Sequence, residues 1–166
     1  MKVNALADKE IIELLYRAAE AGVKIDLIVR GICALRPGGE SGNNFRVRSI
    51  LGRYLEHSRM YRFAHGDDGG APLYLIGSAD MMPRNLDKRV EVLVPVEHPK
   101  HRAWMDKVFD ILMSDDVVSF EMERDGSWTR VGPAEFIDSH DAQYLIHTEN
   151  SHSQTRSDRA ERPQWS

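Results

Sequence analysis

The sequence predicts a mixed α/β fold, in which helices flank a central mixed β-sheet. Residues 7–22 have the apolar spacing of an amphipathic helix, and residues 23–31 follow directly as a β-branched apolar run that is typical of a buried strand. Further strand-like runs occur later, so helical and strand patterns alternate as in a layered α/β sheet. We place one domain at residues 1–150 and expect the polar stretch 151–166 to be a disordered tail.

The first helix carries its own start and stop signals. Asp8 is the expected N-cap, because a short polar side chain can accept a hydrogen bond from the free amides of the first turn. Gly22 is the expected stop, since glycine adopts the left-handed conformation that ends many helices. The apolar face comprises Ile11, Ile12, Leu14, Leu15 and Ala18.

Residues 31–44 follow the first long strand and are rich in Gly, Pro and Asn. This composition predicts a loop, and its length favours a functional role over a simple connection. Three strands are then expected at residues 45–51, 59–64 and 73–78. Residues 79–87 read as a bent connection that leads out of the last of them.

The remaining elements complete the sheet and its cover. Residues 89–96 have the pattern of a buried strand, and residues 99–113 have helical spacing. Residues 116–123 and 127–131 flank a turn that contains Gly126, which predicts a β-hairpin. A short helix is expected at residues 141–147.

Composition excludes several classes of protein. The formal net charge of -4 argues against duplex nucleic acid as a partner, because binding to the phosphate backbone requires a basic face. A single cysteine, Cys33, allows neither an internal disulfide nor a cysteine-based zinc site, and this favours a reducing cytoplasmic setting. No apolar run approaches the ~20 residues of a transmembrane helix, so any contact with a membrane would require partners.

Arginines gather where strands are predicted to end. Arg30 closes an apolar strand, where a charge is costly without a partner, and Arg36 lies in the loop that follows. Since strand ends meet at one edge of an α/β sheet, these guanidinium groups are candidate ligands for phosphate. Arg46 and Arg48 alternate along a strand, and for them phosphate binding and a solvent-exposed face are equally good interpretations.

His57 is the candidate catalytic residue. It precedes Arg59 in an H-x-R pattern, and a strand then leads to "GSAD" at residues 77–80. Imidazole can attack phosphorus or donate a proton to a leaving oxygen near neutral pH. This arrangement resembles the half-site of the phospholipase D superfamily, in which a Gly-Ser turn orients the histidine. The implied fold is a phospholipase D-like layered domain.

A closer resemblance follows from three longer stretches, at residues 4–38, 46–63 and 73–96. Together they resemble the C-terminal catalytic region of bacterial polyphosphate kinase. That family transfers the terminal phosphate of ATP to inorganic polyphosphate through a phosphohistidine and with Mg²⁺. The resemblance implies ATP, ADP and polyphosphate as ligands, and it places the phosphorylated histidine and the Mg²⁺ ligands on a preceding domain that this chain lacks.

The resemblance also implies site residues. His57 matches the second active-site histidine, and Arg30 matches an arginine that binds phosphates, with Arg36 and Arg59 as further phosphate ligands. The supporting turn comprises Ser78, Asp80, Arg84 and Asn85. We expect no metal site in this chain.

Three hypotheses follow. In the first, the chain forms half of a polyphosphate kinase active site and is inactive without the other half, which a missing domain or an oligomeric partner would supply. In the second, two copies pair their His57 motifs as a phosphodiesterase. In the third, the chain is a non-catalytic module for polyphosphate binding or assembly, because an open sheet edge invites pairing.

Overall fold

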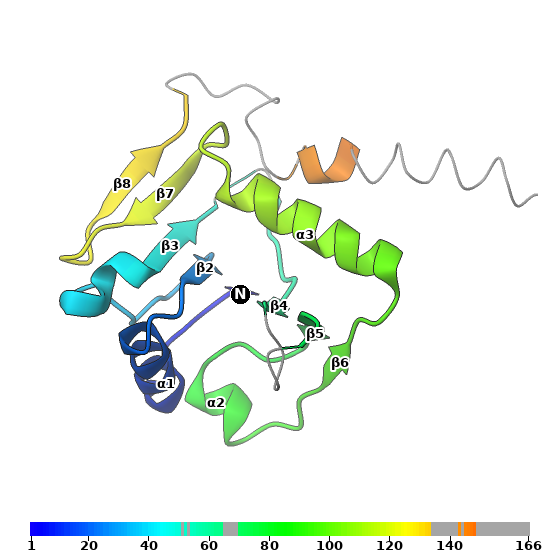
Figure 1. Ribbon diagram of the computed structural model, residues 1–166, viewed down its shortest axis with the longest axis horizontal. Helices are drawn as coiled ribbons and strands as arrows, with labels where there is room; N and C mark the ends of the chain where they lie inside the picture. Colours follow the sequence, from blue (N-terminus) through cyan, green and yellow to red (C-terminus); the bar gives the residue numbers. More distant parts are fainter. Residues whose placement is uncertain (51, 53, 65–69, 134–142, 144, 149–166) are drawn as a thin grey trace, which may run out of the picture.

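The computed structural model confirms the mixed α/β fold. The residues that it describes are 1–50, 52, 54–64, 70–133, 143 and 145–148. Within them, eight strands form one mixed sheet, and helices cover both of its faces (Figure 1). None of the helices in this described part has the length and apolar character needed to cross a bilayer.

The strands are β1 (Lys2–Val3), β2 (Ile25–Val29), β3 (Phe45–Ser49), β4 (Met60–Phe63), β5 (Leu73–Gly77), β6 (Leu93–Pro95), β7 (Ser119–Met122) and β8 (Trp128–Val131). The helices are α1 (Lys9–Glu20), the 3₁₀-helix η1 (Glu40–Asn44), α2 (Pro83–Leu86) and α3 (Pro99–Met113). The sheet order is β6-β5-β4-β1-β2-β3-β7-β8. Strands β1, β2 and β3 are parallel, and all other neighbouring pairs are antiparallel.

Helix α1 covers one face of the sheet and begins and ends as the sequence predicts. The Asp8 carboxylate accepts a hydrogen bond from the amide of Ile11 at 3.0 Å, and Gly22 takes a φ of +88° just after the helix. Its apolar face packs on side chains of the three parallel strands. The buried members of this first core include Val3, Leu27, Val29, Phe45 and Val47.

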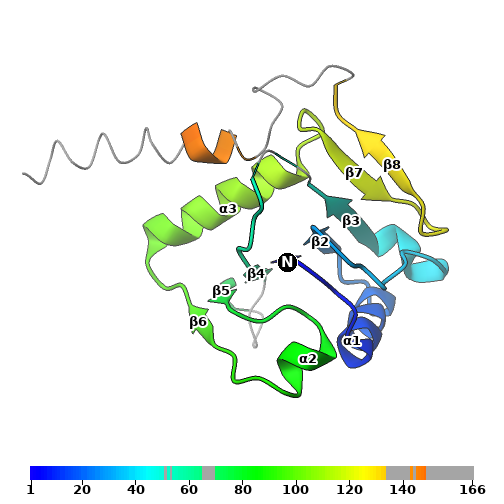
Figure 2. The same cartoon turned by 180° about the vertical axis from the view of Figure 1, so that it is seen from behind.

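Helix α3 covers the opposite face, as the two opposite views show (Figures 1 and 2). Val108 and Leu112 of α3 pack with Ile28, Ile50 and Val117 in a second core. Both faces of the parallel strands are therefore largely buried, which explains why β2 is apolar except for the exposed Asp26.

Several sequence predictions need correction. The stretch 31–44 is not wholly irregular, because it contains η1. Of the strand expected at residues 89–96, only β6 forms, and it is an exposed edge strand rather than a buried one. Pro95 lacks an amide hydrogen and fits such an edge. In the helix expected at 141–147, Gln143 and residues 145–148 are helical, while the predicted tail lies outside the described residues.

Candidate functional site

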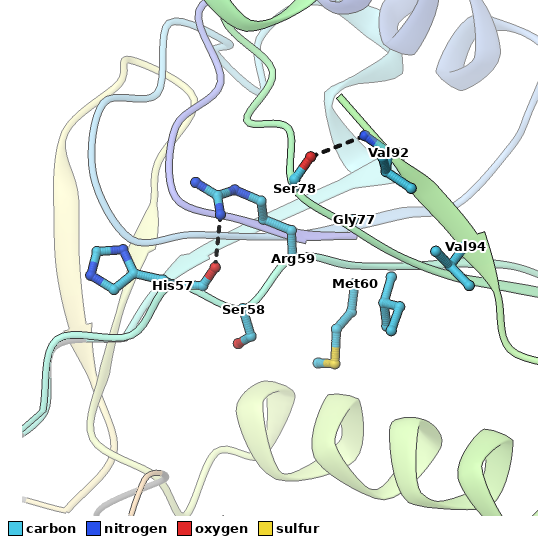
Figure 3. A pocket seen from close by; sticks show the side chains of 9 residues that line it. His57, Ser58, Arg59, Met60, Gly77, Ser78, Val92 and Val94 are labelled. Carbon is cyan, nitrogen blue, oxygen red and sulfur yellow. Dashed lines mark hydrogen bonds between the residues drawn. The ribbon is translucent and has the colours of Figure 1, made fainter. Parts of the chain in front are cut away.

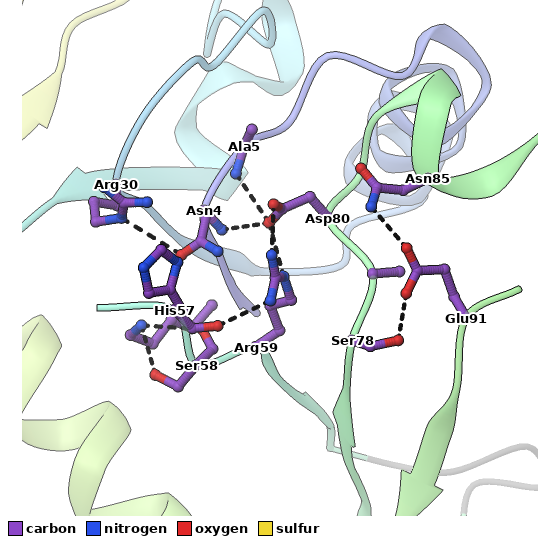
Figure 4. Close-up of polar contacts among 12 residues, drawn as sticks. Asn4, Ala5, Arg30, His57, Ser58, Arg59, Ser78, Asp80, Asn85 and Glu91 are labelled. Carbon is purple, nitrogen blue, oxygen red and sulfur yellow. Dashed lines mark hydrogen bonds and ion pairs between the residues drawn. The ribbon is translucent and has the colours of Figure 1, made fainter. Parts of the chain in front are cut away.

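Most of the predicted site residues lie at one end of the central strands, which is the edge of the sheet meant below. Strands β1 and β2 are parallel and end there, while β4 is antiparallel to β1 and therefore begins there. Strand β5 is antiparallel to β4 and ends at the same edge, where Gly77 also meets the start of β6. The register thus brings together residues that are far apart in sequence: Asn4, Arg30, His57, Ser58, Arg59, Ser78, Asp80 and Glu91 (Figure 4).

Asp80 is buried and fixes Arg59. Its Oδ1 accepts hydrogen bonds from the amides of Asn4 and Ala5 at 2.8 and 3.2 Å and from Arg59 Nε at 3.1 Å. Its Oδ2 accepts from Arg59 Nη2 at 2.8 Å. Burial alone would raise the pKa of Asp80, but the Arg59 guanidinium and the two amides hold it below its usual value. The same ion pair raises the pKa of Arg59.

Tyr61 holds the turn at residues 77–80 through a hydrogen bond. Its hydroxyl donates a hydrogen bond to the carbonyl of Ala79 at 3.1 Å, and the side chain is buried. Burial, together with the nearby charge of Asp80, raises the pKa of Tyr61 to about 12. The hydroxyl therefore stays protonated and remains a donor at physiological pH.

Ser78, Asn85 and Glu91 form a second polar group. Ser78 Oγ donates a hydrogen bond to Glu91 Oε2 and accepts one from the amide of Val92, while Asn85 Nδ2 donates to Glu91 Oε1 at 2.7 Å. These two donors hold the pKa of Glu91 below its usual value. Glu91 falls within the buried strand predicted at residues 89–96, but it lies before β6 and binds Ser78 and Asn85.

A groove with a volume of ≈ 450 Å³ lies along this edge (Figure 3). Its surface is mostly apolar and comes from residues that include Met60, Ile76, Val92 and Val94, while His57, Ser58, Arg59 and Ser78 also line it; in Figure 3 the His57 ring and the Arg59 guanidinium point away from Met60 and Val94. Gly77 also lines it, and a side chain there would come within 2.5 Å of Leu93 Cδ2. Glycine at residue 77 therefore allows β6 to lie close to β5.

His57 and Arg30 keep their polar groups available. The His57 side chain is exposed, and no described residue forms a hydrogen bond to its ring, although its carbonyl accepts one from Arg59 Nη1 at 3.0 Å. Arg30 is half-buried, with Nε 3.5 Å from the side-chain amide of Asn4, and it has no carboxylate partner in the described part of the chain. In Figure 4 both side chains lie on the same side of the Arg59–Asp80 pair.

The other predicted residues are more scattered. Arg36 lies away from the groove, where its Nη1 donates to the carbonyl of Asp125 at 3.2 Å and its main chain is bound by the Tyr16 hydroxyl. Arg84 is exposed on α2, whereas Asn85 is buried and its Oδ1 has no hydrogen-bond partner among the described atoms.

Arg46 and Arg48 do not reach this edge. Both guanidinium groups form ion pairs with Asp115 and Glu121 on the face that α3 covers. Of the two interpretations that the sequence left open, phosphate binding is not supported, and the exposed face is wrong for Arg48, because that side chain is fully buried.

Sequence reasoning missed three residues that hold the segment around His57. Lys2 binds Glu56 and Ser58, Asn4 lies beside Arg59, and Gln143 binds both the amide and the carbonyl of Tyr54. The only signal in the sequence is polar residues at Lys2 and Asn4 within an otherwise apolar start. Gln143 gives no signal, because its contact spans 89 residues of sequence.

Comparison with known proteins identifies a family to which this chain is similar. The family model described as "Polyphosphate kinase C-terminal domain 2" matches residues 1–143. Among curated proteins, polyphosphate kinases of Streptomyces coelicolor and Mycobacterium avium are 50% and 51% identical over 131 residues, which is 78% of this chain and 17% of each relative. The polyphosphate kinase of Campylobacter jejuni subsp. doylei is 43% identical over 134 residues, or 81% of this chain and 19% of the relative.

A solved structure is also similar. The crystal structure of polyphosphate kinase from Porphyromonas gingivalis superposes with a TM-score of 0.76 and 36% sequence identity, covering 90% of this chain and 23% of that one. The chain thus spans less than a quarter of the length of these relatives.

Proposed function

The chain belongs to the polyphosphate kinase C-terminal domain family, and from that membership we propose that it forms the C-terminal half of a polyphosphate kinase active site. In this proposal it binds the phosphates of ATP and of inorganic polyphosphate for reversible transfer of a phosphoryl group between them. The half-site is completed by another part of the enzyme or by a second copy, and the 166-residue chain is inactive alone.

One observation carries the proposal: hydrogen bonds hold the main chain around His57 in place, while no residue in the described part of the chain forms a hydrogen bond to its imidazole. Arg59 holds the His57 carbonyl, and Asp80 holds Arg59. A side chain with only a structural role would be expected to use its own ring nitrogens in such contacts. A fixed but unoccupied imidazole instead suits proton donation to a phosphate oxygen, or a hydrogen bond to one.

Arg30 supplies the positive charge in this proposal. The transition state of phosphoryl transfer spreads negative charge over several oxygens, so fixed cationic donors are the main requirement. Arg59 directs its guanidinium towards Asp80 and the His57 carbonyl, whereas Arg30 keeps donors that a phosphate can occupy. Arg30 is thus the better phosphate ligand, and Arg59 chiefly fixes the site.

Mg²⁺ is expected from the family, but the residues described here do not fit it alone. No three His, Cys, Asp or Glu side chains gather as a metal site in the described part of the chain. The carboxylates of Asp80 and Glu91 already accept hydrogen bonds from protein donors. In this proposal the magnesium ligands therefore lie elsewhere, and these residues act on the phosphates directly.

Phosphate binding tests the proposal. We expect the chain to bind tripolyphosphate and ATP weakly in isothermal titration calorimetry, and Arg30→Ala to weaken binding by about tenfold or more, because a charge-assisted hydrogen bond contributes about 1.5–3 kcal/mol. His57→Ala is expected to weaken binding as well. Arg17→Ala is the matched control, since Arg17 is exposed on α1 away from this edge. Unchanged affinity in both site variants would favour the non-catalytic module instead.

Labelling with ATP tests the division of roles. When the chain is incubated with ATP labelled on its terminal phosphate, we expect no label to be retained, because the histidine that becomes phosphorylated is proposed to lie outside these residues. The protein would be separated from nucleotide under alkaline conditions, in which phosphohistidine survives. Label that is retained by the chain but lost in His57→Gln would make His57 itself the nucleophile and would contradict the proposal.

A further inference from the structure

Lys2 is a buried cation in the middle of the sheet. It lies on β1, is only 3% exposed, and its ammonium forms two hydrogen bonds and one ion pair. Nζ lies 3.1 Å from Glu56 Oε2, 3.1 Å from the carbonyl of Ser58 and 2.9 Å from Ser58 Oγ. These contacts reach the residues on either side of His57.

The segment that carries His57 has no regular secondary structure of its own. Residues 55–59 lie outside any helix or strand, and the backbone hydrogen bond from the Gly77 amide to the Arg59 carbonyl, at 3.2 Å, fixes only the end of this segment next to β4. The side-chain amide of Asn4, two residues after Lys2, satisfies both of its neighbours when its oxygen faces Arg59: it then donates to the Glu56 carbonyl at 3.0 Å and accepts from Arg59 Nη2 at 2.9 Å. The side chains of Lys2 on β1 and of Asn4 just after it therefore help to hold the segment that carries His57.

Stability alone does not account for a lysine at this position. A buried ammonium must give up its hydration, and apolar side chains that replace a whole buried ion pair often preserve stability, although removal of one partner alone is costly. The neighbouring residue on β1, Val3, follows that apolar pattern and packs in the core with α1. Lys2 instead directs its charge at main-chain and side-chain oxygens of the segment around His57.

We propose that Lys2 is a positioning residue for His57: its ammonium holds Glu56 and Ser58 so that the imidazole between them keeps one orientation, on the side of the Arg59–Asp80 pair where Arg30 lies. The inference rests on the role proposed for His57 above. Lys2 itself is buried behind this segment and touches no phosphate. It acts through the main chain, in the way that supporting residues hold a reactive group within the narrow range of geometry that catalysis tolerates.

The test is the variant Lys2→Met in the 166-residue chain, studied by NMR and calorimetry. The His57 ring signal, assigned by its loss in His57→Gln, is expected to shift and broaden, and the amides of residues 56–58 should show faster internal motion. Tripolyphosphate affinity is expected to fall, and by no more than in His57→Ala, because Lys2 acts on the phosphate only through the position of the imidazole. Ser58→Ala removes one of the three contacts and should change the same signals in the same direction, but less.

A variant that is destabilised elsewhere serves as the control. Arg48→Met removes another buried cation, on β3, and should lower stability without moving the His57 signal or the affinity for tripolyphosphate. The inference is overturned if Lys2→Met folds with an unchanged His57 ring signal and unchanged motion, or if Arg48→Met alters both equally. If the unsubstituted chain fails to bind tripolyphosphate, the proposed function fails, and the NMR signals alone then decide whether Lys2 positions His57.

Discussion

Replacement of Arg48 by methionine is expected to lower the free energy of unfolding by about 3 kcal/mol. Arg48 is fully buried between β3 and the end of α3, where Nη1 donates to the Ser114 carbonyl at 2.8 Å and Nε donates to Glu121 Oε2 at 3.0 Å. Nη2 also pairs with Asp115. Methionine fills the space of the aliphatic stem but removes the donor to the Ser114 carbonyl and leaves Asp115 and Glu121 with Arg46 as their remaining partner.

Arg46→Met is the matched control for Arg48→Met. Arg46 binds the same two carboxylates, but its side chain is 35% exposed. Exposed ion pairs contribute little, so a loss below about 1 kcal/mol is expected. Urea denaturation followed by circular dichroism measures both variants. Equal losses would show that the difference in burial does not matter and would contradict the prediction.

The sequence predicts elements well where the signal is local. Asp8 and Gly22 mark the ends of α1 because capping depends on residues within one turn of the helix. The hairpin of β7 and β8 was also predicted correctly, since Gly126 takes a φ of +87° in the turn between them. The prediction for residues 89–96 failed because an apolar strand has the same pattern whether or not anything covers it. Within the described residues, Leu93 and Val94 stay exposed.

The candidate site also could be predicted only in part from the sequence. His57, Arg59 and Asp80 could be selected from the sequence through the H-x-R and GSAD motifs, but their roles remain predictions. The contacts that organise them join residues far apart in the chain. The contact of Lys2 with Ser58 spans 56 residues, and that of Asn4 with Asp80 spans 76. The hydrophobic periodicity of the sequence cannot predict such long-range contacts, because they depend on the order in which the strands pair in the sheet. For the same reason, the sequence could not show that Arg46 and Arg48 form ion pairs with distant carboxylates while Arg30 lies at the candidate site.

Replacement of Asp80 by alanine is the second substitution for which we expect a large effect. The amides of Asn4 and Ala5 would lose their acceptor, and Arg59 would lose its ion-pair partner inside a nearly buried site. Each unsatisfied buried group costs about 1–3 kcal/mol, so the free energy of unfolding at pH 7 should fall by about 3 kcal/mol. Asp80→Asn is the control, because it keeps the shape and one acceptor oxygen but removes the charge, and it should lose less.

The dependence on pH separates the charge of Asp80 from its shape. A carboxylate whose pKa is lower in the folded protein than in the unfolded chain stabilises the fold above the unfolded value, ~3.9 for Asp. That stabilisation disappears as the pH falls through the folded pKa. The gap in stability between the unsubstituted chain and Asp80→Ala should therefore be constant from pH 7 to about 5 and should narrow below about 4. Urea denaturation at several pH values measures this gap. A gap that keeps its full size in acid would mean that Asp80 acts through its shape alone, and that the ion pair with Arg59 does not hold the turn beside His57.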